Sequence, residues 1–240
     1  MKSLERIESL LITIDRLGMA TVEHLRNCHD LKSQRNAYTV LKKLEEYTNT
    51  TYLHRKKIFY LNKKGREMIG SEKEIDKNRN MKHMLLRNDV YLALNKPITW
   101  EVEKVLEFEK NSNTSKLDVI IKGLNMTERK KIQADAFFTR NGYTYYVEID
   151  NLMSMMENHK KIVNYSEFMA KDNTARLLIF THTLERKRKF EKWLKEKNIS
   201  FDKLIVNARD KAKTCIENKI DIFIDDNADF CKGVSQNGTK

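Results

Sequence analysis

The chain has few of the residues that interrupt or cross-link a fold: its 240 residues include one proline, seven glycines and three cysteines. Cys28, Cys215 and Cys231 are odd in number and lack framework spacing, which argues against a disulfide-stapled scaffold. They fit a reducing cytoplasm, where we expect the protein to be located. The scarcity of proline and glycine favours long, uninterrupted helices.

Long hydrophobic runs are lacking as well. No apolar stretch approaches the roughly 20 residues of a membrane span, so no membrane partner is expected. Residues 1–18 are amphipathic and interrupted by charges, unlike the apolar core of a signal peptide. The six histidines show no metal-ligand spacing with the cysteines, and there is no Walker loop, GxGxxG or GxSxG motif. The length allows one or two domains.

Acidic residues are in deficit. The chain has 46 Lys+Arg against 34 Asp+Glu, which gives a net charge of +12. Residues 1–80 hold 17 basic and 11 acidic residues (+6), and the other 160 hold 29 and 23 (+6), so the N-terminal third has twice the charge density. Nucleic acid is therefore the first expected partner. The alternative is that the charge only keeps the protein soluble.

The N-terminal pattern is helical. Apolar residues at spacings of three and four predict a helix over 3–17, which Gly18 ends in a left-handed conformation. Thr21 is placed to cap a short second helix, and Ser33 to cap a third that reaches Glu46. This third helix has an apolar inner stripe and a polar outer face.

Two β-prone runs, 50–53 and 58–61, then flank a basic tip at 54–57. Three helices, a basic hairpin and a further helix resemble a winged helix-turn-helix domain, here 1–70. The resemblance implies that the third helix enters the major groove and the wing contacts the backbone. The implied partner is double-stranded DNA, contacted through Gln34, Arg35, Asn36, Thr39, Lys42, Lys43, Arg55, Lys56 and Lys57. The alternative is a small helical domain for protein contacts.

The remaining chain changes character. Residues 71–97 are expected to be a linker and a connecting helix that ends before Pro97, and this helix is a candidate homodimer interface. Over 98–231 the runs 100–108, 117–122, 132–138, 143–149, 177–180, 204–206 and 220–224 predict strands, and 152–170 and 184–197 predict helices. This order predicts an α/β domain with a mixed sheet, so that the whole chain is α+β. The polar tail, 232–240, is expected to be flexible.

An acidic cluster falls within this second domain. Asn141-Gly142 is a strong hairpin signal, and the hairpin places Asp135 on one strand with Glu148 and Asp150 on the other. Adjacent strands lie about 4.8 Å apart, so carboxylates on one sheet face can converge. The cluster either holds a divalent cation that faces phosphate, or is the remnant of such a site.

Strand, hairpin, strand and helix in this order resemble the core of PD-(D/E)XK nucleases. Together with the preceding winged helix, the chain resembles the replication-relaxation family of bacterial plasmids and phages. The residues that carry the resemblance, over most of 1–182, are Ala134-Asp135-Ala136, Glu148-Ile149-Asp150, Glu157, Lys161 and Tyr165. It implies a role in replication or DNA relaxation of mobile elements, with Mg²⁺ held by Asp135 and Glu148.

The chain departs from the nuclease pattern, because Asp150 stands where Glu-x-Lys has lysine. If Lys161 or Lys160 from the next helix replaces that lysine, the protein is a Mg²⁺-dependent nicking or cleaving endonuclease with Asp135, Glu148, Asp150 and Lys161 as catalytic residues. Otherwise the site is degenerate and the protein is a DNA-binding factor in replication, relaxation or transcriptional control. Taken alone, Glu157 and Lys161 predict an ordinary surface ion pair at i,i+4, Tyr165 a core residue, and Glu101 a weaker metal ligand.

Overall fold

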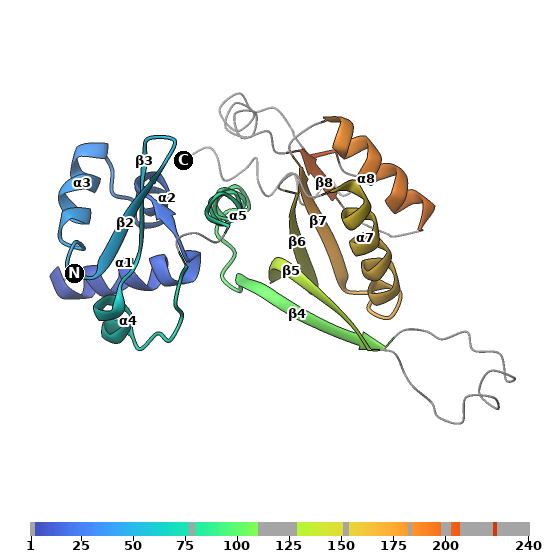
Figure 1. Cartoon of the computed structure of the whole chain (residues 1–240), viewed down its shortest axis with the longest axis horizontal. Helices are drawn as coiled ribbons and strands as arrows, with labels where there is room; N and C mark the ends of the chain where they lie inside the picture. The colour runs from blue at the N-terminus through green and yellow to red at the C-terminus, as the bar shows by residue number, and fades with distance from the viewer. Residues whose placement is uncertain are drawn as a thin grey trace, which may run out of the picture. The chain divides into compact units, whose positions relative to one another are not determined.

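The computed structural model describes residues 3–76, 80–109, 129–150, 154–181, 184–197, 203–206 and 223–224. The chain divides into two compact units, Met1–Pro97 (unit 1) and Ile98–Lys240 (unit 2). Figure 1 colours the chain by residue number, from blue at the N-terminus to red at the C-terminus. Helices occur in both units and each unit has its own sheet, which confirms the α+β class. Among the described residues, no helix has the length and apolar character needed to cross a bilayer.

Unit 1 begins with helices whose starts follow from their capping residues. Its elements are α1 (Ser3–Leu17), β1 (Ala20–Thr21), α2 (Val22–His29), α3 (Gln34–Lys42), β2 (Thr48–Leu53), β3 (Lys56–Leu61), α4 (Lys63–Ile69) and α5 (Met81–Ala93). Gly18 has a φ of 75° after α1, as its position predicted. Thr21 caps α2 in a reciprocal capping box with His24, and the Ser33 hydroxyl accepts a hydrogen bond from the Asn36 backbone N–H at the start of α3.

The end of α3 differs from the prediction. The helix ends at Lys42, one turn before Glu46. Beyond it the backbone N–H groups of Leu44 and Glu45 donate to carbonyls three residues back, so the helix gives way to tight turns. The Thr48 hydroxyl then donates to the Leu44 carbonyl at 2.8 Å, which fixes the entry into β2. The apolar periodicity of the sequence favours a helix up to Glu46, but the chain leaves the helix at Lys42 so that β2 can begin at Thr48.

The sheet of unit 1 has the antiparallel order β1-β3-β2, with β2 and β3 paired from Thr48↔Leu61 to Leu53↔Lys56. Ile58 packs against Met84 and Leu85 of α5, with Leu53 and Tyr60 at the edge of this cluster. The stretch 71–97, where the sequence favours a linker and connecting helix, thus contributes α5 to unit 1. The Asn88 side-chain amide strengthens the docking by donating to the Met19 carbonyl at 2.6 Å.

The turn between β2 and β3 has an uncommon backbone. His54 and Arg55 have φ values of 47° and 63°, so both central residues are left-handed, as a tight type I′ turn requires. In unit 2 the corresponding turn between β5 and β6 uses Asn141 and Gly142, at 52° and 78°. Glycine and asparagine adopt this conformation readily, whereas His54 and Arg55 adopt it at a cost in free energy.

Unit 2 contains one six-stranded sheet of order β4-β5-β6-β7-β8-β9. Its elements are β4 (Glu101–Glu109), β5 (Arg129–Arg140), β6 (Tyr143–Asp150), α7 (Met155–Met169), β7 (Ala175–Thr181), α8 (Leu184–Glu196), β8 (Lys203–Val206) and β9 (Phe223–Ile224). β6, β7 and β8 are parallel and the other neighbours are antiparallel, so the sheet is mixed as predicted. The strand expected at 117–122, the tail 232–240, Cys215 and Cys231 lie outside the described residues.

Helices α7 and α8 cover the same face of this sheet (Figure 1). Tyr146 and Leu177 of the sheet share a buried cluster with Tyr165 of α7 and Phe190 of α8. Because β6 and β7 run in parallel, they end at the same edge of the sheet, and α7 and α8 start just beyond that edge. Side chains at the carboxyl ends of both strands and on the first turns of both helices are thereby brought together.

Candidate functional site

The outer face of α3 is one candidate site, and it lies in unit 1. Ala37 and Leu41 turn inward and are buried. The polar residues on the other side of the helix are consequently exposed: Gln34, Arg35, Asn36, Thr39 and Lys42, with Lys43 just beyond the helix. Tyr38, which sequence reasoning passed over, shares this face and is 48% exposed. Its spacing from Arg35 and Lys42, three and four residues, was the signal that could have revealed it.

Two of the predicted contact residues have tasks within the protein. The Asn36 side-chain amide donates to the Leu31 carbonyl at 2.9 Å, and the Thr39 hydroxyl donates to the Arg35 carbonyl at 3.1 Å. These bonds help to fix the α2–α3 turn and the helix itself. Among the described residues, the side chains of Arg35 and Lys42 make no hydrogen bond or ion pair, so these cations are available to an external anion.

The tip of the β2–β3 hairpin adds three cations. Arg55 and Lys56 are exposed, and Lys57 is half-buried with its ammonium 5.2 Å from the Phe59 ring centroid. Lys56 also lies 3.7 Å from a carboxylate oxygen of Glu23, a solvent-exposed pair of small energetic value. The predicted residues of the tip are therefore all at or near the surface, and each of the two lysines has one weak contact within the chain.

A second candidate site lies in unit 2, where β5, β6 and α7 meet. The register Ala136↔Val147 sets Asp135 of β5 across from Glu148 of β6. One Asp135 carboxylate oxygen accepts a hydrogen bond from the Ile149 backbone N–H at 2.6 Å. Glu148 is only 8% exposed. Its Oε1 accepts from the Tyr165 hydroxyl at 2.6 Å, and its Oε2 accepts from the Lys161 ammonium.

Burial and charge shift the ionisation of this cluster. Burial raises the pKa of Glu148, and the Asp135 carboxylate adds to the shift, so that the pKa reaches about 8 although Lys161 and Tyr165 oppose the rise. Burial lowers the pKa of Lys161, but the charges of Glu148 and Asp135 outweigh burial and leave it above its ordinary value. The lysine therefore stays charged beside a carboxyl group that binds a proton easily.

Asp150 lies in a separate network two residues further along β6. It is 4% exposed. Arg186 of α8 donates to both carboxylate oxygens, from Nε at 2.5 Å and from a terminal nitrogen at 2.6 Å. Asn158 of α7 donates to Oδ1 at 3.1 Å and Thr181 of β7 to Oδ2 at 2.9 Å. The geometry therefore makes Asp150 an anchor that joins β6, β7, α7 and α8.

These donor sets do not fit a divalent metal centre. Mg²⁺ and Ca²⁺ prefer carboxylate and carbonyl oxygens. Both Glu148 oxygens already accept from α7, and both Asp150 oxygens accept from Arg186. No group of three His, Cys, Asp or Glu side chains within the described ranges is arranged to hold a metal ion. A cation at Glu148 would first have to displace the Lys161 ammonium.

Other predicted residues are placed apart from this cluster. Lys160 is exposed, so of the two candidate lysines on α7 it is Lys161 that reaches the site. In the described part of the chain Lys161 does not pair with Glu157, so the surface pair expected there is wrong. Glu101 lies 3.8 Å from Lys104 on β4. Sequence reasoning missed Arg186, because a pairing across 36 positions leaves no local pattern.

The chain was compared with known families, curated proteins and solved structures. No curated protein matches it. Among solved structures, protein VC1899 from Vibrio cholerae is similar with a TM-score of 0.37 and 11% identity, over 97% of this chain and 52% of that one. The chain thus spans about half the length of that protein. The family model described as replication-relaxation matches residues 11–180. This match covers well over half of the sequence, and the chain belongs to the replication-relaxation family.

Proposed function

We propose that the protein is a DNA-binding factor of a plasmid or phage that acts in replication, in DNA relaxation or in transcriptional control of the element. Membership of the replication-relaxation family supports a role in replication or relaxation. The observation that carries the DNA-binding part is the exposed cationic surface of α3 and the β2–β3 tip, on which Arg35 and Lys42 form no hydrogen bond or ion pair with any described residue.

The order of elements in unit 1 supports the winged helix-turn-helix interpretation. α2 and α3 are joined by a short turn, and the β2–β3 hairpin follows directly. In such domains the second helix of the turn lies in the major groove, where arginine reads guanine edges, while lysines bind phosphates. Arg35 is then a base-reading residue, and Lys57 on the wing a phosphate contact.

The strained turn is a second line of support. A non-glycine residue in the left-handed region costs on the order of 1 kcal/mol or more, and such costs cluster where side chains have a function. The chain builds the same turn with Asn141-Gly142 in unit 2, yet keeps His54-Arg55 in unit 1. The wing tip therefore retains basic side chains at the expense of backbone free energy.

Unit 2 is proposed as a nuclease-like scaffold whose acidic site is degenerate. Its strand, hairpin, strand and helix support the likeness to the PD-(D/E)XK core. The inward Lys161 and the Asp150–Arg186 pair support the degenerate interpretation, since they use the carboxylate oxygens that a cation would need. One observation favours the alternative, a Mg²⁺-dependent endonuclease: Asp135, Glu148 and Lys161 do meet at one point.

Charge removal on α3 and the wing tests the DNA-binding surface. Arg35→Ala should weaken binding to the preferred sequence about tenfold and relax specificity, since a base contact contributes about 1–3 kcal/mol. Lys57→Ala should weaken binding to all sequences alike and reduce the slope of log affinity against log salt by about 0.9. Gel shifts over a salt series measure both. Lys63→Ala, which removes a lysine of α4 outside the proposed surface, is the control and should bind as wild type. Unchanged affinity in both surface variants would reject this interface.

Replacement of His54-Arg55 by Asn-Gly should move stability and binding in opposite directions. Relief of the left-handed strain should raise the free energy of unfolding of unit 1 by about 1 kcal/mol. Loss of the Arg55 cation from the tip should weaken DNA binding about five- to tenfold. Urea unfolding and fluorescence anisotropy measure the two effects, and Arg55→Ala, which keeps the strain, should lose affinity without the gain in stability. A variant that is more stable and binds DNA normally would show that the tip makes no contact.

A nicking assay on supercoiled plasmid distinguishes a degenerate site in unit 2 from an active Mg²⁺-dependent endonuclease. We expect no Mg²⁺-dependent conversion to open circle by the wild-type protein, because the carboxylate oxygens are already engaged. Asp135→Asn and Glu148→Gln should then behave as wild type in the same assay. Glu101→Gln, an exposed carboxylate on β4, serves as a control for a contaminating nuclease. Nicking that persists in Glu101→Gln but disappears in the other two variants would establish the enzyme.

A further inference from the structure

Two tyrosine side chains stand out on the surface of unit 1. Tyr52 on β2 is 65% exposed and Tyr38 on α3 is 48% exposed. The other tyrosines and phenylalanines of the described part of unit 1 are buried or half-buried. Both exposed rings belong to the elements that form the proposed DNA surface. An aromatic ring offers a large apolar area, and leaving it in water forgoes the stabilisation that burial would bring.

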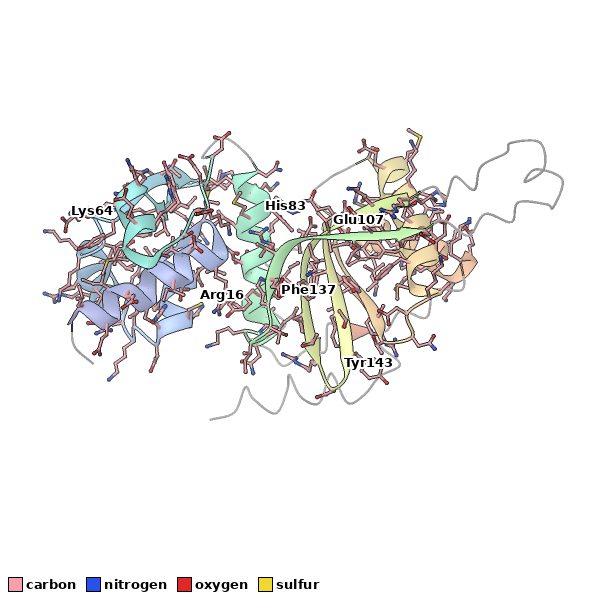
Figure 2. All side chains as sticks on the ribbon, turned by 90° about the horizontal axis from the view of Figure 1, so that it is seen from below. Arg16, Lys64, His83, Glu107, Phe137 and Tyr143 are labelled. Carbon is pink, nitrogen blue, oxygen red and sulfur yellow. The ribbon has the colours of Figure 1, made fainter. Side chains whose placement is uncertain are left out.

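Elsewhere the chain covers its outer rings with its own cations. Lys64 lies over Tyr47 at 5.6 Å, Lys104 over Phe137 at 4.7 Å and Arg176 over Tyr143 at 4.2 Å. Figure 2 labels Lys64, Phe137 and Tyr143 on their elements. Tyr52 has no ring, cation or hydrogen-bond contact among the described residues. Its face is therefore open to a partner from outside.

The surroundings of Tyr52 are cationic. In the hairpin register Tyr52 stands opposite Lys57, so both side chains lie on one face of the sheet. The neighbouring positions Leu53 and Ile58 belong to the opposite face, where Ile58 packs against α5. Arg55 follows at the tip, whereas Lys56 stands opposite Leu53 and belongs to the other face. An open aromatic ring among cations is the combination by which proteins bind unpaired bases.

The chemistry of stacking decides what the ring can bind. In a paired duplex each base is already stacked on its neighbours and presents only its edges to the grooves. An unpaired base has a free face, and stacking that face on an aromatic ring is the main attraction in single-strand binding. Tyr52 should therefore add little to the affinity for a continuous duplex and much to the affinity for DNA that has an unpaired base.

We propose that the protein recognises a junction between duplex and single-stranded DNA, with Tyr52 stacked on an unpaired base while α3 lies against the adjacent duplex. This inference rests on the proposed function, because it needs α3 to hold the duplex. It names the substrate class of that surface: a partly opened DNA, with phosphates for the cations and a free base for the ring.

Fluorescence anisotropy with matched DNAs tests the proposal. The probes are a paired duplex, the same duplex with a single-stranded arm, and the arm alone. The full chain should bind the junction about tenfold more tightly than the duplex. Tyr52→Ala should lose this preference and keep its duplex affinity, whereas Tyr52→Phe should retain both. Tyr143→Ala in unit 2 is the control and should match wild type.

The fluorescence of a base analogue distinguishes direct stacking on Tyr52 from a role of Tyr52 in the structure of unit 1. 2-Aminopurine in the unpaired arm should lose fluorescence on binding to wild type and to Tyr52→Phe, and keep it with Tyr52→Ala. Equal affinity for duplex and junction, or a preference that survives in Tyr52→Ala, would overturn the inference and leave the proposed function standing. Absence of binding to all three DNAs would overturn the proposed function itself.

Discussion

The structure of unit 2 depends on how one buried carboxyl group, that of Glu148, is satisfied. A buried carboxyl group without partners would be strongly unfavourable, and α7 supplies both partners. Lys161 and Tyr165, one helical turn apart, reach the two oxygens of Glu148. These two hydrogen bonds dock α7 on β6. They also occupy both carboxylate oxygens of Glu148, the atoms that would otherwise coordinate a metal ion. Loss of either partner would leave a buried charge or acceptor unpaired, which is costly.

The neighbouring Asp150 repeats this arrangement with α8. Glu148 and Asp150, two residues apart on β6, point to the same face of the sheet, and each fastens one helix through a cation. The acidic cluster of a basic protein is therefore explained by internal cations. Exposed charges occur in both units, but it is in unit 1 that α3 and the β2–β3 tip present cations beside exposed tyrosine rings. In this account unit 1 makes the DNA contacts, and unit 2 is a scaffold built on a nuclease-like plan.

Local signals in the sequence predicted much of this structure. Thr21 and Ser33 mark helix starts because their side chains bond the nearby backbone, and Asn141-Gly142 marks a turn because both residues accept positive φ. The end of α3 at Lys42 could not be predicted from the sequence, because it depends on how the chain turns to enter β2. The sequence offered Lys161 and Lys160 as alternatives for the site and did not decide between them. The partnership of Arg186 with Asp150 escaped, because it depends on a contact between distant elements. The exposure of the Tyr52 ring could not be predicted either, because the periodicity of a strand does not say how much of each side chain its neighbours cover.

Titration of Mn²⁺ into the full-length protein by isothermal calorimetry under nitrogen tests the central claim most directly, with wild type and Glu148→Gln compared at about pH 9, one unit above the pKa of Glu148. At that pH the Glu148 proton is largely lost, so that a failure to bind reflects the Lys161 and Tyr165 contacts and not protonation. The account predicts identical heats for both proteins, with no saturable site. One Mn²⁺ bound per chain by wild type, and lost in Glu148→Gln, would contradict it.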